Sequence, residues 1–128
     1  MKSFFTIASL LMVTLFSSFN INAGIDDVVA AMKTGNASQV AKFFDNNIEI
    51  TMPDKSNTYS KSQGELILKD FFATNIVKSF DVLHKGDNAG SQFCIGNLVT
   101  KGGTYRTTIY MKQKGDQLVL QELRFENR

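Results

Sequence analysis

The residues of this chain that could do chemistry are few and dispersed. His84 is the single histidine and Cys94 the single cysteine. A general base at His84 would need a partner to orient it, but Asp81 lies three residues earlier, and positions i and i+3 of a strand face opposite sides. A nucleophilic Cys94 would need a base and an electropositive site, which the sequence does not supply. We therefore interpret His84 as a structural residue near a strand end and Cys94 as a small buried hydrophobic residue.

A second group of side chains could serve a pocket enzyme of the isomerase or dehydratase type. Such an enzyme needs a carboxylate base and hydroxyl donors in a dry pocket. The residues of these types are Tyr59, Asp70, Asp81, Tyr105, Tyr110 and Glu122. Most of the acids are better explained as solvated surface groups, and no Ser-His-Asp arrangement, phosphate loop, Cys-x-x-Cys pair or nucleotide fingerprint accompanies them. We assign no catalytic residue.

The charge and the ligand set exclude further classes of site. Zinc prefers several histidine or cysteine ligands, and this chain has one of each, so we expect no metal and no cofactor. The formal net charge is +2 and no basic block stands out, so nucleic acid is not an expected partner. A single cysteine cannot form an intrachain disulfide.

The first 23 residues have the pattern of a secretory signal peptide. Lys2 supplies the positive start, residues 4–16 are apolar or small, and the tail ends in Ile21-Asn22-Ala23. The apolar run is too short to span a bilayer, although a retained membrane anchor is the alternative. We expect an exported protein, periplasmic or extracellular. Its mature part, residues 24–128, should form one domain with no membrane span after signal cleavage.

The second half of the mature chain predicts a sheet. It contains four extended, alternating stretches, residues 76–85, 92–100, 104–114 and 117–126. Gly102-Gly103 and Gly115-Asp116 are expected two-residue hairpin loops, which fix the register of the neighbouring strands. The first would pair Lys101 with Thr104, and the second would pair Tyr110 with Gln121.

This register distributes apolar side chains over both faces of the sheet. One face would carry Cys94, Leu98, Tyr105, Ile109, Met111, Leu118 and Leu120. The other would carry Phe93, Ile95, Val99, Tyr110, Val119, Leu123 and Phe125. An antiparallel sheet with one solvated face should instead alternate cleanly between polar and apolar residues. Helices can cover one face, and which face is concave stays open. We expect the other face to form a homodimer.

The first half of the mature chain predicts helices and a short hairpin. A helix over residues 25–34 ends at Gly35, and a second, capped by Asn36, ends at 45–47. Residues 48–52 and 58–61 would pair as a hairpin. A third helix would begin with a capping box of Ser62 and Glu65 and close at Asn75. The predicted fold is α+β: three N-terminal helices with a short β-hairpin, packed on a curved four-stranded antiparallel sheet that forms a cone.

Short stretches along the whole mature chain resemble a known family. They are Gly35-Asn36-Ala37-Ser38, Tyr59-Ser60-Lys61-Ser62, Leu68-Lys69-Asp70-Phe71-Phe72, Lys78-Ser79-Phe80, His84-Lys85-Gly86, Ile95-Gly96, Gly103-Thr104-Tyr105-Arg106 and Gln121-Glu122-Leu123-Arg124. They are similar to domain of unknown function 4783, a family of small exported bacterial proteins. The order of elements resembles the nuclear-transport-factor-2-like, or cystatin-like, cone. The resemblance implies this fold and no established activity, because the cone fold hosts enzymes, binding modules and interaction domains.

Three functions remain open from the sequence. The leading hypothesis is a non-catalytic exported module that binds a small apolar ligand or a protein. The alternatives are a small pocket enzyme of the isomerase or dehydratase type and a structural adaptor whose cone is filled, for example by Phe71 and Phe72. The residues expected to line a pocket are Tyr59, Phe71, His84, Asn97, Thr108, Tyr110 and Gln121.

Overall fold

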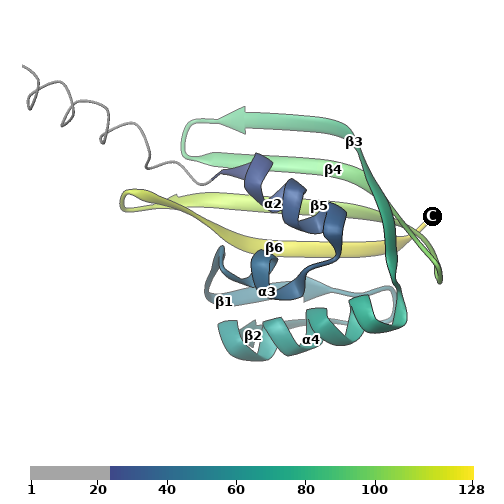
Figure 1. Ribbon diagram of the computed structural model, residues 1–128. Helices are drawn as coiled ribbons and strands as arrows, with labels where there is room; N and C mark the ends of the chain where they lie inside the picture. Colours follow the sequence, from purple (N-terminus) through teal and green to yellow (C-terminus); the bar gives the residue numbers. More distant parts are fainter. Residues whose placement is uncertain (1–23) are drawn as a thin grey trace, which may run out of the picture.

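A computed structural model describes residues 24–128 of the chain (Figure 1). The predicted signal peptide, residues 1–23, lies outside the described residues. Within them the elements run in the order α2 (Ile25–Thr34), α3 (Ala37–Ala41), β1 (Phe44–Thr51), β2 (Ser56–Ser60), α4 (Lys61–Thr74), β3 (Val77–Asn88), β4 (Ser91–Thr100), β5 (Gly103–Lys114) and β6 (Gln117–Asn127). None of the helices of this part of the chain is long and apolar enough to cross a membrane.

The strands form one six-stranded mixed sheet in the order β2-β1-β6-β5-β4-β3. The prediction of a four-stranded antiparallel sheet is therefore wrong. The expected short hairpin joins the sheet because β1 pairs in parallel with β6, the last strand of the chain. β1 also begins earlier than expected, at Phe44, so Asp45, Asn46 and Asn47 belong to a strand and do not end a helix. The helices precede the strands only in part, since α4 follows β2.

The helix boundaries follow local signals. α2 has the predicted bounds, and Gly35 ends it with a φ of +64°, a left-handed conformation that glycine adopts without steric cost. α4 starts slightly earlier than expected, because its capping box is formed by Ser60 and Gln63, not by Ser62 and Glu65. The hydroxyl of Ser60 accepts a hydrogen bond from the Gln63 backbone N–H at 3.3 Å.

Two details of the register differ from the prediction. The β4–β5 loop is Lys101-Gly102, since Thr100 pairs with Gly103. This moves the register by two residues and leaves the side chains of β4 and β5 on their predicted faces. In β6 a β-bulge lies between the pairs Met111–Leu120 and Tyr110–Glu122. The bulge adds Gln121 to the strand, so the residues after it change face. Leu123 and Phe125 therefore lie in the core on the same face as Leu120, whereas the prediction put them on the face opposite to Leu120.

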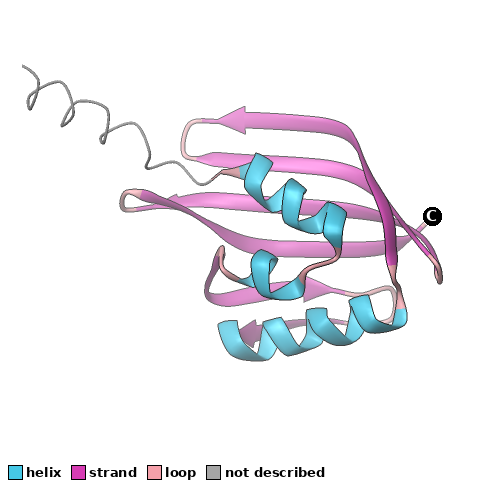
Figure 2. Cartoon of the chain, in the orientation of Figure 1, coloured by secondary structure: helices cyan, strands magenta, loops and turns pink. Residues whose placement is uncertain are grey.

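The core lies between the helices and one face of the sheet, and Figure 2 shows the helices gathered on that side. This covered face carries fully buried side chains, Leu98, Ile109, Met111, Leu120, Leu123 and Phe125. Val28, Met32, Val40 and Leu68 of the helices are also fully buried. The other face, called the outer face below, is covered by no described element. It carries Phe93, Ile95, Asn97, Val99, Thr108 and Tyr110, all half-buried.

Aromatic side chains fill one end of the space between α4 and the sheet. The ring of Phe71 lies 4.5 Å from that of Phe125 and 5.2 Å from that of Tyr105, measured between centroids. The hydroxyl of Tyr105 donates a 2.8 Å hydrogen bond to the Asn75 side chain at the end of α4. Phe72 is buried and Phe71 half-buried. This end of the cone is therefore filled.

Candidate functional site

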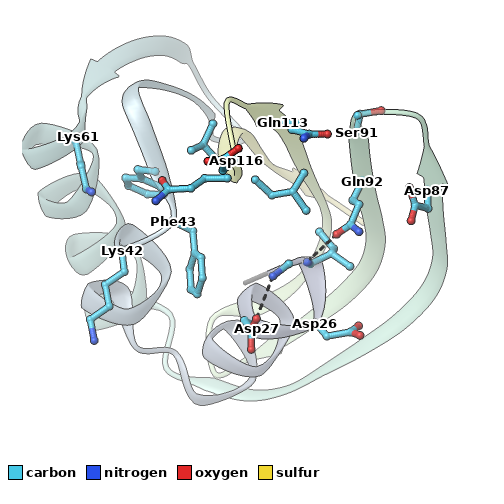
Figure 3. Close-up of a pocket in the computed structure, with 17 residues that line it drawn as sticks. Asp26, Asp27, Lys42, Phe43, Lys61, Asp87, Ser91, Gln92, Gln113 and Asp116 are labelled. Carbon is cyan, nitrogen blue, oxygen red and sulfur yellow. Dashed lines mark hydrogen bonds between the residues drawn. The ribbon is translucent and has the colours of Figure 1, made fainter. Parts of the chain in front are cut away.

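The opposite end of the cone is hollow. A pocket of about 650 Å³ opens there, where α2 begins, α3 ends and the β3–β4 and β5–β6 turns meet (Figure 3). It is lined by Gly24, Ile25, Asp26, Asp27, Lys42, Phe43, Phe44, Lys61, Asp87, Gly90, Ser91, Gln92, Gln113, Asp116, Gln117, Leu118 and Val119. A volume of this size holds a small organic molecule.

Hydrogen bonds at the start of α2 shape one side of the pocket. The side chain of Gln92 on β4 accepts a 3.0 Å hydrogen bond from the backbone N–H of Ile25. The Asp27 carboxylate accepts one from the Gly24 backbone N–H, also at 3.0 Å. Both bonds satisfy N–H groups that a helix N-terminus leaves without a partner. They hold the first turn of α2 against the sheet.

Asp45 anchors the β5–β6 hairpin, which forms another side of the pocket. Its carboxylate accepts hydrogen bonds from the Lys114 ammonium at 2.9 Å and from the Gln121 amide at 3.2 Å. The hydrogen bond from Lys114 is the main reason why the pKa of Asp45 lies below its usual value of 3.8. Because Gln121 is the extra residue of the β-bulge, this carboxylate also ties the bulge to β1.

None of the seven residues expected to line a pocket lines this one. Tyr59 lies on β2 and Phe71 on α4, where both pack against the core. His84 is exposed on β3, with its ring 5.4 Å from that of Phe93. Gln121 binds Asp45 at the bulge.

The other three candidates come together on the outer face, on the neighbouring strands β4 and β5. They are Asn97, Thr108 and Tyr110. The side-chain oxygen of Asn97 is buried without a hydrogen-bond partner among the described residues. It lies beside a shallow hollow lined by Asp81, Asn97, Val99, Thr104 and Arg128. These three candidates therefore belong to an open surface.

The structure also bears on the cysteine and on the metal site that were considered from the sequence. Cys94 is fully buried on β4, and this burial raises the pKa of its thiol, so the reactive thiolate is disfavoured. In residues 24–128 no group of three or more histidine, cysteine, aspartate and glutamate side chains could hold a metal ion.

The outer face carries one carboxylate with a raised pKa. Glu122 on β6 is the cross-strand neighbour of Glu49 on β1. Burial raises the pKa of Glu122 from 4.5, a hydrogen bond to Glu49 and the charge of Glu49 raise it further, and Arg124 opposes the shift. The protonated form of Glu122, hydrogen-bonded to Glu49, is therefore favoured on the outer face.

We predict that Glu122→Gln stabilises the protein at neutral pH and that the gain disappears in acid. A pKa above its unfolded value means that the folded state favours the protonated acid. The contribution of this carboxyl group to stability is therefore greatest below about pH 4.5 and is lost as pH rises through its folded pKa. The gain should be below about 1 kcal/mol, because the pair is partly solvated. Urea unfolding between pH 4 and pH 8 measures it, with Asp54→Asn in the β1–β2 turn as control. The measured quantity is the difference in free energy of unfolding between Glu122→Gln and the wild type. If this difference were no larger at pH 7 than at pH 4, the prediction would be wrong.

The pocket residues were missed because they come from turns and element ends. Gln92, Gln113 and Gln117 flank the β3–β4 and β5–β6 turns, while Lys42 and Lys61 lie next to β1 and β2. One signal was available in the sequence. In an antiparallel meander alternate turns lie at the same end of the sheet, so the polar residues beside Gly90 and Gly115 had to meet.

The layered arrangement, a curved sheet with helices on one face and a pocket at the open end, is that of the nuclear-transport-factor-2-like class of α+β proteins. An NTF2-like protein of unknown function from Cytophaga hutchinsonii has this fold, with a TM-score of 0.57, 12% identity, and coverage of 79% of this chain and 83% of that one. Within this class, the model of domain of unknown function 4783 matches residues 25–126, and the chain belongs to that family.

Two solved structures of the family are similar to this chain. The protein from Bacteroides uniformis has a TM-score of 0.80 and 26% identity, covering 83% of this chain and 98% of its own. The protein from Bacteroides ovatus has a TM-score of 0.79 and 24% identity, covering 85% and 98%. No curated protein matches the chain. The resemblance seen in the sequence is thus confirmed, and it brings a fold without an activity.

Proposed function

We propose that the protein is an exported, non-catalytic binding module that holds a small polar ligand in the pocket at the open end of the cone. The observation that carries the proposal is the lining of this pocket. Charged and amide side chains make up most of the lining, together with the apolar residues Ile25, Phe43, Phe44, Leu118 and Val119. Such a lining favours a polar ligand over the apolar one expected from the sequence.

The distribution of perturbed groups supports binding over an isomerase or dehydratase activity. A pocket enzyme of that type needs a base with a tuned pKa inside the pocket. In residues 24–128, four side chains have a clearly shifted pKa, namely Asp45, Lys85, Cys94 and Glu122, and all four lie outside the pocket lining. The carboxylate with the raised pKa, Glu122, lies on the outer face.

Thermal denaturation with a panel of polar compounds tests the proposal. We predict that a sugar, nucleoside, amino acid or short peptide at millimolar concentration raises the melting temperature. A ligand at one hundred times its dissociation constant adds about 2.7 kcal/mol. Gln117→Trp should abolish the shift, since Gln117 is exposed and lines the pocket. Lys55→Trp, in the β1–β2 turn at the other end of the sheet, should keep it. No shift with any compound would contradict the proposal.

We also propose that two copies of the protein associate through the outer face. Phe93, Ile95, Val99 and Tyr110 supply an apolar centre on this face, and no described element covers it. The same face also carries charges of both signs. Glu49 and Glu122 are acidic, and Arg106 and Arg124 are basic. A two-fold contact brings a surface against itself, so it is favoured where both signs occur.

Sedimentation at micromolar concentration tests this association. We predict a dimer for the wild type and a monomer for Ile95→Arg, because a buried unpaired charge in the centre of an interface is costly. Leu66→Arg is the matched control, since Leu66 is the most exposed large apolar residue of the described chain and lies on α4. A wild-type monomer would show that the outer face meets no second copy.

A further inference from the structure

The pocket separates its charges by sign, and the strand order is the cause. Lys42 and Lys61 lie next to β1 and β2, at one side of the sheet. Asp87 lies at the end of β3, at the other side, together with Asp26 and Asp27 of α2, which packs on β3. Figure 3 shows the two lysines on the left of the pocket and Asp26 and Asp87 on the right. The pocket therefore has a cationic side and an anionic side.

Several of these charges have no ion partner within residues 24–128. On the anionic side, the Lys85 ammonium binds Asp26 at 2.8 Å, and the Asp27 carboxylate accepts a 3.0 Å hydrogen bond from the Gly24 backbone N–H. Asp87 has neither kind of contact among these residues. On the cationic side, neither Lys42 nor Lys61 forms an ion pair in this part of the chain. Asp116 stands between the two sides on the β5–β6 turn and is also unpaired there.

The groups between the two sides match a peptide backbone. The Gln92 amide uses its oxygen to hold Ile25, so its N–H groups remain available to the pocket. The Gln113 amide donates to the backbone oxygen of Gly115, so its own oxygen remains available. Phe43 and Leu118 add apolar surface to the lining. A peptide backbone could accept a hydrogen bond from Gln92 and donate one to Gln113. A side chain of moderate size on the peptide could contact the apolar residues.

We propose that the pocket takes a zwitterion, a short peptide with a free amino and a free carboxyl end. The carboxylate lies toward Lys42 and Lys61 and the ammonium toward Asp87. An anion alone would meet four aspartates, and a cation alone would leave the two lysines without a partner. This inference rests on the proposed binding function and adds the class of ligand and its direction in the pocket.

Calorimetry with the tripeptide Ala-Leu-Ala tests the inference. Acetylation of its amino end and amidation of its carboxyl end each remove one charge, and each should weaken binding by about five-fold or more. The double variant Lys42→Gln/Lys61→Gln should make the protein indifferent to amidation of the peptide, while it keeps its preference for the free amine. Asp87→Asn should do the reverse. Lys55→Gln and Asp54→Asn, two exposed residues of the β1–β2 turn outside the pocket, should keep both preferences.

The outcomes separate this inference from the proposed function. Equal binding of the doubly blocked and the free tripeptide would overturn the zwitterion and leave the pocket as a binding site. The same holds if another polar compound stabilises the protein and the free tripeptide does not bind. If no compound of any class binds, both the inference and the proposed function fail.

Discussion

Phe125→Ala should lower the free energy of unfolding by about 3–5 kcal/mol, the usual cost of removing a buried aromatic ring. Phe125 is the largest of the fully buried side chains and is 0% exposed. Its ring contacts that of Phe71 at 4.5 Å between centroids, so truncation leaves a cavity and removes a stacking partner. In a domain of this size the melting temperature should fall by more than 10 °C. Urea unfolding measures the change.

Two further variants separate the packing of Phe125 from a general effect of truncation. Leu66→Ala on the exposed side of α4 removes an apolar side chain that is 61% exposed, and should change stability by less than about 0.5 kcal/mol. A double-mutant cycle with Phe71→Ala should give a coupling of about 0.5–1.5 kcal/mol. A loss below about 1 kcal/mol for Phe125→Ala would mean that the ring lies on the outer face.

The face of Phe125 is also the point where sequence reasoning failed. Strict alternation from the Gly115-Asp116 turn puts Leu118 and Leu120 on one face and Phe125 on the other. The bulge at Gln121 shifts the pairing by one residue, from Tyr110–Gln121 to Tyr110–Glu122. Nothing in the local residue pattern marks this position. The contacts that stabilise the bulge, from Gln121 and Lys114 to Asp45, join residues about 70 positions apart.

The same distinction between local and distant signals explains the rest of the fold. The bounds of α2, the caps at Gly35 and Asn75 and the β5–β6 turn depend on residues within one turn of each other, and all could be predicted. The parallel pairing of β1 with β6 connects the two ends of the domain and leaves no local trace. That pairing turns an isolated hairpin into two strands of the main sheet, and it was missed.

For the site, the sequence supplied candidates from strand interiors, whereas the pocket is built from strand ends. Tyr110 and Asn97 are polar or aromatic residues inside strands that carry many apolar residues. Residues in such positions lie either in the core or on the outer face. The pocket opens at the end of the cone, where Gln92, Gln113 and Asp87 adjoin the turns. Turns carry function because a rigid sheet positions them.

Gly96→Ala should destabilise the protein by about 1–3 kcal/mol. This is the opposite of the usual effect, since replacing a glycine inside a strand by alanine normally stabilises a protein. Gly96 lies in the middle of β4, and its neighbour on β3 is bulged between Val82 and His84. A Cβ atom added at Gly96 would lie 2.7 Å from the backbone oxygen of Asp81 and 2.7 Å from the ring of Phe80. The ring could move, but the carbonyl belongs to the strand and cannot move without breaking the pairing.

The pair Gly96→Ala and Phe80→Leu tests this steric explanation. Phe80 is 3% exposed, so Phe80→Leu alone should destabilise the protein by leaving space in the core. In the double variant that space receives the new methyl group, so the loss should be smaller than the sum of the two single losses. The remaining deficit reports the contact with the Asp81 carbonyl. If Gly96→Ala were neutral or stabilising in urea unfolding, β3 would not lie close over Gly96.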